Sequence, residues 1–234
     1  MKTSPNDNLA VLIDADNAQA SPIHELLEEV SRYGTASVKR AYGDWSTPQL
    51  RKWKEELHTH AIKPVQQFSY TKGKNATDSA LIIDAMDLLH SGDLNGFCLV
   101  SSDSDFTALA NRLRENGLMV VGIGEKKAPE ALRNVCNRFI FIENVGGEAE
   151  KETVRKSDPE TLNDAFQLIA NAMEKIDQEG DWFDLGPIGK TILTVHPDFD
   201  TRSYGHSKLS ALVKAIPRLE TKREGTMLMV RRRD

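Results

Sequence analysis

The sequence lacks long apolar runs and contains few cysteines. No stretch of about 18 consecutive apolar residues occurs, so we expect no membrane-spanning helix. The first residues, MKTSPNDN, include no apolar core of a secretory signal. The only two cysteines are Cys98, in an apolar run, and Cys136, in an amphipathic segment. Such positions are typical of buried free thiols in a reducing compartment. We therefore expect a cytoplasmic protein without a disulfide.

Charge is divided unevenly along the chain, although the formal net charge is only −5. Residues 1–148 hold 16 basic and 20 acidic residues, and residues 149–201 hold 5 basic and 12 acidic residues. Residues 202–234 reverse the sign, with 9 basic and 3 acidic residues. Because this last segment has the patterning of folded structure, its charge predicts a surface that faces a polyanion.

Short apolar segments alternate with segments of helical periodicity through the first 145 residues. This alternation is typical of an α/β fold, a mostly parallel sheet with helices on both faces. The predicted strands are residues 9–13, 36–42, 61–67, 96–100, 118–123 and 138–142, and the predicted helices are residues 22–33, 47–58, 77–90, 105–116 and 128–137. In such sheets ligands bind beyond the carboxyl ends of the strands, where the strand order reverses.

A second, smaller domain is predicted after a segment that cannot contribute to a core. Residues 144–160 carry paired glycines, many charges and almost no large apolar side chains, so we place the linker there. Helical periodicity then returns at residues 162–176, near residues 188–194 and at residues 208–216, before a hairpin with its turn at Glu224 and Gly225. Three helices and a terminal β-ribbon are typical of a winged helix-turn-helix.

Aspartates follow two of the predicted strands. Asp14 follows the first strand, and Asp103 and Asp105 follow the strand at residues 96–100. Asp78 lies in or near the first turn of the helix predicted at residues 77–90. The ends of the first and fourth strands are neighbours in a doubly wound sheet, so the carboxylates are expected to converge. Close carboxylates repel one another and have raised pKa values unless a cation compensates their charge.

An oxygen-only cluster favours Mg²⁺ or Mn²⁺ over Zn²⁺, because no cysteine or histidine ligand set accompanies it. A divalent cation at an open carboxylate site supports phosphoryl chemistry. Taken singly, Asp78 and Asp103 have an alternative role as partners of a helix N-terminus. Nearby basic and aromatic residues are candidates for substrate contact, with simple packing as the alternative for each. They are Arg40, Lys72 and Lys74, together with Tyr42 and Trp45 for stacking on a base.

Three motifs in this order, VLIDADN, GKNATDSALIIDAMDLL and LVSSDSDFTALANRLRENGLMVVGIG, resemble the NYN domain of the PIN-like nuclease superfamily. The resemblance spans roughly residues 8–145. It implies a parallel sheet of five or six strands and metal-dependent cleavage of RNA. By position, it assigns metal-binding and catalytic roles to Asp14, Asp78, Asp103 and Asp105.

Further positions also match the motifs of this family. Asn17, Lys74 and Ser101 fall on family positions, which implies roles in orientation and phosphate contact. Asp84 matches the second acidic position of the helix motif. Because it lies six residues after Asp78, on a different helix face, we expect it to make a structural hydrogen bond.

The second half of the chain is similar to the LOTUS domain, also called OST-HTH, in LNDAFQLIANAM and LGPIGKTILTVHPDFDTRSYGHSKLSALV. This resemblance implies a winged-helix fold that binds RNA and, in some members, protein partners. Phe199, Tyr204 and Leu209 are expected in the core. The candidates for an RNA-facing surface are Arg202, His206, Lys208 and Lys214.

We therefore expect an NYN catalytic domain over residues 1–147, a linker over residues 148–159 and a LOTUS domain over residues 160–234. The expected activity is that of a ribonuclease dependent on Mg²⁺ or Mn²⁺. Two alternatives remain open. A haloacid-dehalogenase-like phosphatase also places Asp-x-Asp after an apolar strand, although Asn17 and the segment from Lys74 to Asp78 fit the nuclease pattern better. The second alternative is a non-catalytic adaptor that holds RNA or a protein.

Overall fold

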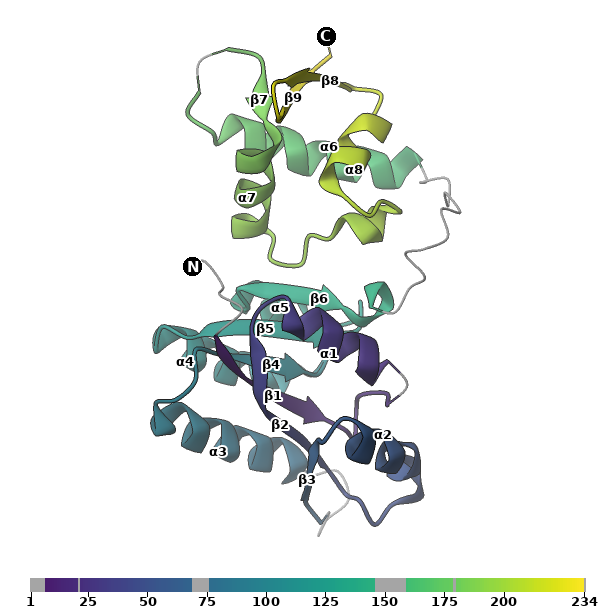
Figure 1. Ribbon diagram of the computed structural model, residues 1–234, viewed down its shortest axis with the longest axis vertical. Helices are drawn as coiled ribbons and strands as arrows, with labels where there is room; N and C mark the ends of the chain where they lie inside the picture. Colours follow the sequence, from purple (N-terminus) through teal and green to yellow (C-terminus); the bar gives the residue numbers. More distant parts are fainter. Residues whose placement is uncertain (1–6, 21, 69–75, 146–158, 179, 234) are drawn as a thin grey trace. The chain divides into compact units, whose positions relative to one another are not determined.

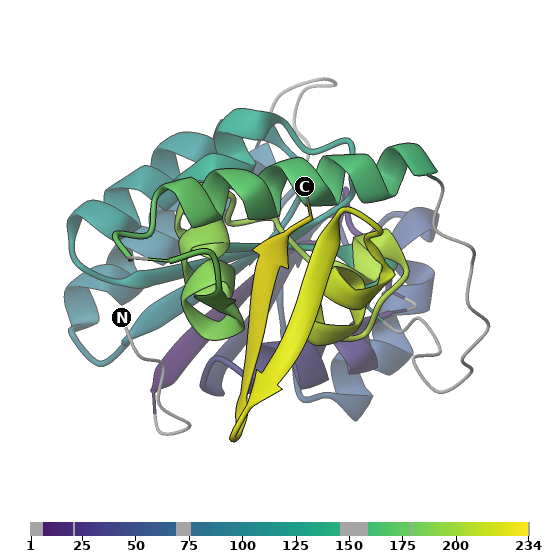
Figure 2. The same cartoon turned by 90° about the horizontal axis from the view of Figure 1, so that it is seen from above.

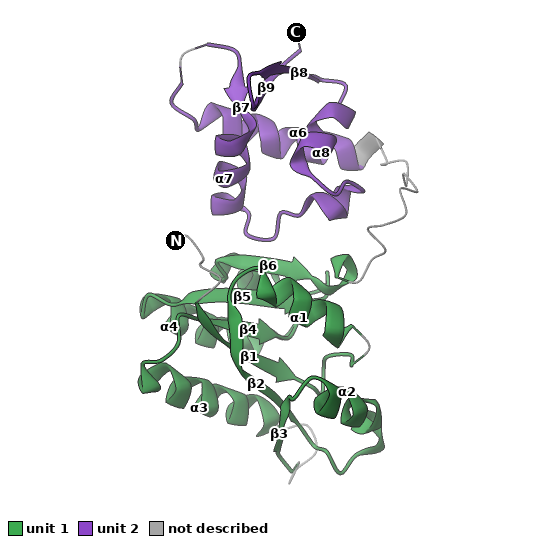
Figure 3. Ribbon diagram, in the orientation of Figure 1, with its two compact units in different colours: residues 1–147 green, residues 148–234 purple. Residues whose placement is uncertain are grey.

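The computed structural model describes residues 7–20, 22–68, 76–145, 159–178 and 180–233. The chain divides into two compact units, residues 1–147 and residues 148–234, which Figure 3 draws in different colours. In the part of the chain that the structure describes, no helix is both long and apolar enough to cross a membrane.

The first unit is built on a six-stranded, entirely parallel sheet (Figure 1). Its strands are β1 (Asn8–Asp14), β2 (Thr35–Gly43), β3 (Lys63–Gln66), β4 (Gly96–Val100), β5 (Met119–Gly124) and β6 (Arg138–Phe141), in the order β3-β2-β1-β4-β5-β6. The chain runs outward from β1 to β3 and then returns to pair β4 with the other edge of β1. The strand order therefore reverses between β1 and β4, which confirms the predicted fold class and the predicted neighbours.

Helices cover both faces of this sheet because its strands alternate their side chains between two cores. Leu9, Val11 and Ile13 of β1 pack on one face with α1 (Ile23–Ser31), the 3₁₀ helix η1 (Pro48–Lys52) and α2 (Trp53–Thr59). Ala10 and Leu12 pack on the other face with α3 (Ala76–Ser91), α4 (Thr107–Glu115) and α5 (Glu130–Val135). Cys98 and Cys136 are buried free thiols in these cores, as predicted.

The predicted element boundaries differ mainly where a helix begins with a tighter turn. The helix predicted at residues 47–58 starts as η1, with Pro48 in its first turn, and continues as α2. Before α4 the chain forms the 3₁₀ turn η2 (Ser104–Phe106), and after β6 it forms η3 (Ile142–Asn144). At the starts of α2 and α4, such turns satisfy backbone groups that the α-helical pattern leaves without partners.

The second unit packs three helices against a small antiparallel sheet. The helices are α6 (Pro159–Glu174), α7 (Leu185–Val195) and α8 (Leu209–Ala215), with the 3₁₀ turn η4 (Thr201–Tyr204) before α8. The sheet has the order β7-β9-β8, with β7 (Phe183–Asp184), β8 (Leu219–Glu224) and β9 (Met227–Arg232). Figure 2 shows β8 and β9 side by side as the two long strands. Phe199 is buried in this core, and Tyr204 and Leu209 pack against it, as predicted.

Two details of the second unit differ from the sequence prediction. Strand β7 was not predicted, because two residues are too short for a period-two pattern to be recognised. The hairpin turn lies at Gly225 and Thr226, one residue later than predicted, since Glu224 still pairs with Met227 in the ladder. Gly225 has a φ of 61°, a left-handed conformation that favours glycine in a two-residue hairpin loop.

Candidate metal centre

Four of the predicted aspartates lie around the place where the strand order reverses. Asp14 is the last residue of β1, and Asp103 and Asp105 follow β4, which pairs with β1. Asp78 lies in the first turn of α3, the helix that brings the chain back toward β4. Carboxylates from three separate segments therefore come to the carboxyl end of the central strands.

Asp78, Asp103 and Asp105 form the tightest group. Each offers one carboxylate oxygen, and the three oxygens lie within 4.8 Å of one another. Asp103 also accepts a hydrogen bond of 2.9 Å from the backbone N–H of Asp105, as the cap of η2. The capping role considered for Asp103 is therefore real, and it occupies only one oxygen of that carboxylate.

Asp14 lies outside this group of three and is buried completely. Its Oδ2 atom accepts hydrogen bonds of 2.9 Å from the Asn17 amide and 2.9 Å from the Ser101 hydroxyl. Its Oδ1 atom is buried and has no hydrogen-bond partner among the described residues. Burial raises the pKa of Asp14, while the hydrogen bonds from Asn17 and Ser101 act in the opposite direction. A buried carboxylate oxygen without a donor is costly, and a cation would satisfy it.

Ser101 connects the two strand ends. Its hydroxyl donates to Asp14 and accepts a hydrogen bond of 3.1 Å from the backbone N–H of Asp103. The backbone N–H of Ser101 in turn donates to Ile123 of β5 at 3.0 Å. The side chain of Asn17 makes the other contact to Asp14 from the turn after β1. Ser101 and Asn17 therefore orient Asp14 in this structure.

The electrostatics of the cluster are those of excess negative charge. Burial, followed by the charges of Asp14, Asp103, Asp105 and Asp16, raises the pKa of Asp78 to about 6. A divalent cation would remove this repulsion. The atoms available as ligands to a cation are carboxylate oxygens of Asp78, Asp103 and Asp105, together with the Asp14 oxygen that has no hydrogen-bond partner among the described residues. Such a set fits Mg²⁺ or Mn²⁺, which prefer hard oxygen ligands.

Asp16 is a further aspartate whose charge acts on Asp78 and Asp14, and it was not among the predicted site residues. Its carboxylate accepts a hydrogen bond of 2.7 Å from the Thr77 hydroxyl on α3 and one of 3.3 Å from the backbone N–H of Asp44. Asp16 thus ties the turn after β1 to the start of α3, next to Asp78. The Asp-x-Asp spacing of Asp14 and Asp16 was the signal in the sequence.

Arg40, predicted to contact substrate, is engaged elsewhere. Its guanidinium forms an ion pair with Asp84, and the Tyr42 hydroxyl donates to the same carboxylate. Asp84 therefore has the structural role expected of it. The prediction that Tyr42 stacks on a base is wrong, because its side chain is buried completely in the core between the sheet and the helices α3 and α4.

Trp45 is only partly buried and is fixed at the end of β3. Its indole N–H donates to the carbonyl of Val65 at 3.0 Å, and its backbone N–H donates to Gln66 at 3.1 Å. The ring thus remains a candidate for contact with a base. Lys72 and Lys74, the other two predicted substrate contacts, lie outside the described residues.

The four candidates for the RNA-facing surface of the second unit differ in their surroundings. The Arg202 guanidinium forms hydrogen bonds of 2.6 to 3.0 Å with Asp200. His206 is partly buried and closes η4 through its backbone. Lys208 and Lys214 are exposed at the two ends of α8. Only the two lysines therefore present an exposed charge of the predicted kind.

Comparison with known proteins supports the same division of the chain. Residues 8–143 match the NYN domain, and residues 160–230 match the OST-HTH/LOTUS domain. Comparison with curated proteins gives no match. Among solved structures, the chain is similar to a protein of unknown function from Vibrio parahaemolyticus, with 17% identity and a TM-score of 0.49; the similarity covers 59% of this chain and 94% of that chain. Since the NYN match covers more than half of the sequence, the chain belongs to the NYN domain family, and its NYN domain is followed by an OST-HTH/LOTUS domain.

Proposed function

We propose that the protein is a ribonuclease that hydrolyses phosphodiester bonds of RNA at the aspartate cluster with the help of Mg²⁺ or Mn²⁺. The observation that carries this proposal is the convergence of Asp78, Asp103 and Asp105 next to the buried, unsatisfied oxygen of Asp14. Such an arrangement is costly without a cation. Membership in the NYN family, whose domains are usually nucleases, favours RNA cleavage over other phosphoryl chemistry.

In this proposal Asp78, Asp103 and Asp105 hold the cation, and Asp14 completes the site from the buried side. When bound, the cation lowers the pKa of a water and stabilises charge on the reacting phosphate. Ser101 and Asn17 keep the Asp14 carboxylate in one orientation through their hydrogen bonds. That preorganisation reduces the reorganisation required when charge develops at the phosphate.

The second unit is proposed to capture RNA. Its match to the OST-HTH/LOTUS domain and the exposed Lys208 and Lys214 around α8 support this role. Contacts of this kind with phosphates release counterions, so affinity should fall steeply as salt rises. The alternative is that this surface of the second unit binds a protein partner in place of RNA. The buried thiols of Cys98 and Cys136 fit a reducing compartment, and we place the protein in the cytoplasm.

The test is cleavage of a labelled single-stranded RNA with Mn²⁺, with Mg²⁺ and with EDTA. Asp103→Asn removes one ligand charge at nearly constant size. It should lower the rate by roughly 100-fold or more, because a bound cation stabilises the charge of the transition state by several kcal/mol. Asp87→Asn is the matched control, because Asp87 is exposed on α3 and lies outside the cluster. Circular dichroism checks that both variants keep the wild-type fold.

Three results would contradict the proposal in different ways. Equal cleavage by wild type and Asp103→Asn would separate the activity from this cluster. Release of phosphate from small phosphomonoesters, with RNA left intact, would identify a phosphatase. RNA binding without cleavage under any of the three conditions would identify an adaptor.

A further inference from the structure

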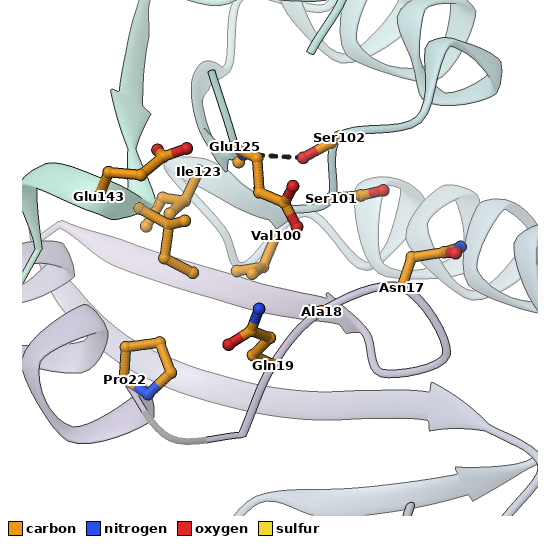
Figure 4. A pocket seen from close by; sticks show the side chains of 12 residues that line it. Asn17, Ala18, Gln19, Pro22, Val100, Ser101, Ser102, Ile123, Glu125 and Glu143 are labelled. Atoms are coloured by element: carbon orange, nitrogen blue, oxygen red, sulfur yellow. Dashed lines mark hydrogen bonds between the residues drawn. The ribbon is translucent and has the colours of Figure 1, made fainter. Parts of the chain in front are cut away.

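A cavity of about 360 Å³ adjoins the aspartate cluster on the other side of Asn17 and Ser101. Segments that follow β1, β4, β5 and β6 surround it, at the carboxyl end of the sheet (Figure 4). Asn17 and Ser101 line the cavity and also hold the Asp14 carboxylate. A group that occupies the cavity therefore lies next to the metal centre. Its size falls within the range of sites for small organic groups, roughly 300–1,000 Å³.

The lining combines apolar walls with hydrogen-bond acceptors. Ala18, Pro22 and Ile142 are partly exposed apolar residues of the lining. The polar groups include the carboxylates of Glu125 and Glu143. Two carboxylates so close to the aspartate cluster repel a phosphate, so the cavity does not suit the backbone of RNA. It suits a flat, uncharged group that has an apolar face and hydrogen-bond donors along its edge, as a nucleobase does.

Glu125 follows β5 and is held in place by the loop after β4. Its backbone N–H donates to the Ser102 hydroxyl at 2.7 Å, a contact drawn in Figure 4. Its carboxylate forms an ion pair of 2.8 Å with Lys127, whose side chain is 71% exposed. Each carboxylate oxygen can accept a second hydrogen bond, so this exposed pair leaves acceptor capacity in the cavity. Figure 4 shows Glu125 and Gln19 extending into the cavity from opposite sides.

We infer that this cavity binds one base of the RNA substrate and prefers guanine, an inference that rests on the proposed ribonuclease function. Guanine has adjacent N1–H and N2–H donors, which match the two oxygens of one carboxylate, here that of Glu125. Adenine and cytosine place an acceptor beside their amino group, and uracil has acceptors on both sides of its single donor. The Gln19 amide can donate to guanine O6 from the opposite side. The base would thus position the adjoining phosphodiester at the aspartates.

The decisive measurement is the binding of nucleosides, because they carry no phosphate and their binding needs neither metal nor cleavage. Guanosine, inosine, adenosine, cytidine and uridine are titrated into the full-length protein in EDTA and followed by NMR. Guanosine should bind tightest. Inosine, which lacks the 2-amino group, should bind roughly tenfold more weakly, as expected for loss of a hydrogen bond to a charged acceptor.

The variant Glu125→Gln should bind guanosine about tenfold more weakly, because an amide offers one acceptor in place of two. Glu130→Gln, an exposed carboxylate on α5 outside the cavity, is the charge-matched control and should bind guanosine as the wild type does. Cleavage of a random-sequence RNA with Mn²⁺ should give cuts enriched at one fixed position relative to guanine. That enrichment should fall in Glu125→Gln.

The outcomes separate this inference from the proposed function. Equal binding of all nucleosides, or unchanged guanosine binding by Glu125→Gln, overturns the inference, even if the protein cleaves RNA with Mn²⁺. Selective guanosine binding that depends on Glu125, in a protein that cleaves no RNA, keeps the base site and overturns the ribonuclease function. Selective binding together with guanine-enriched cleavage supports both.

Discussion

Asp78 is the residue at which the free-energy cost of bringing the carboxylates together is most directly measurable. It is 8% exposed and lies beside Asp103 and Asp105. Burial and the neighbouring carboxylates raise its pKa from 3.8 to about 6. An acid with a raised pKa in the folded state weakens folding once the pH exceeds its pKa in the unfolded chain. The metal-free protein therefore carries a destabilising group at neutral pH.

We predict that Asp78→Asn stabilises the metal-free protein at pH 7.5. Between pH 3.8 and about 6 the folded wild type binds more protons than the unfolded chain, so its free energy of unfolding falls as the pH rises through this window. The variant has no such dependence at this site and should be more stable at pH 7.5 by on the order of 1–3 kcal/mol. The difference should shrink toward pH 4. Urea unfolding in EDTA at several pH values measures it.

The control for this prediction is Asp87→Asn, which changes an exposed carboxylate of the same helix and should leave the stability within about 0.5 kcal/mol of the wild type. Added Mg²⁺ should stabilise the wild type more than Asp78→Asn, because the variant has lost a ligand. A variant that is less stable than the wild type in EDTA at every pH would show that the Asp78 carboxylate is not under electrostatic strain.

At the scale of elements, the site depends on close contact between β5 and the loop after β4. Gly124 ends β5, and a Cβ atom added there would lie 2.6 Å from the carbonyl oxygen of Ser101 and 2.9 Å from the Ser102 hydroxyl. Both distances are shorter than ordinary contacts. The absence of a side chain at Gly124 therefore allows β5 to support the segment that carries Ser101 and Asp103.

We predict that Gly124→Ala lowers both stability and activity. The added methyl group must displace backbone at Ser101, which should cost about 1–3 kcal/mol of unfolding free energy and move the hydroxyl that orients Asp14. Gly186→Ala is the control: its Cβ would meet nothing closer than 3.8 Å, so its stability should stay near that of the wild type. Thermal unfolding and RNA cleavage with Mn²⁺ test both variants. Full activity of Gly124→Ala at wild-type stability would refute the argument.

Most of the strands and helices could be predicted from the sequence, and two features that differ, β7 and the hairpin turn, depend on strand pairing. Each strand of the large sheet was found because its apolar run is a local property of the sequence, and β4 begins and ends as predicted. Strand β7 was missed because it exists through its pairing with β9. The hairpin turn was displaced by one residue, since the register of β8 and β9 determines which residues form the loop.

At the scale of the whole molecule, the charge distribution assigns RNA binding and catalysis to different parts of the chain. The first 148 residues carry a net acidic charge, with 16 basic and 20 acidic residues, so they repel a polyanion over a Debye length of about 8 Å at physiological salt. The last 33 residues, 202–234, hold 9 of the 30 basic residues. A domain that binds RNA raises the effective concentration of substrate at a catalytic site in the same chain.

We therefore predict that deletion of residues 150–234 raises the KM for long RNA by roughly tenfold or more and leaves kcat within a few-fold. The first unit has cores of its own, made from β1 to β6 and their helices, so its fold should survive the deletion. Steady-state cleavage by the full-length and shortened proteins gives both constants. A short oligonucleotide is the control substrate and should show a smaller change. An unchanged KM with a collapsed kcat would assign the second unit a role other than capture.

The sequence by itself determined the order of the elements and the placement of Asp14, Asp78, Asp103 and Asp105 near strand and helix ends, because hydrophobic periodicity and motifs are local. Only the tertiary structure decided which side chains meet. Arg40 and Asp84 are 44 residues apart in sequence, and their pairing depends on how α3 packs on the sheet. The same packing buries Tyr42 and joins Asp16 to Thr77, and the meeting of the segments after β1, β4, β5 and β6 forms the cavity beside Ser101. Such contacts join residues that are distant in sequence, so no local pattern encodes them.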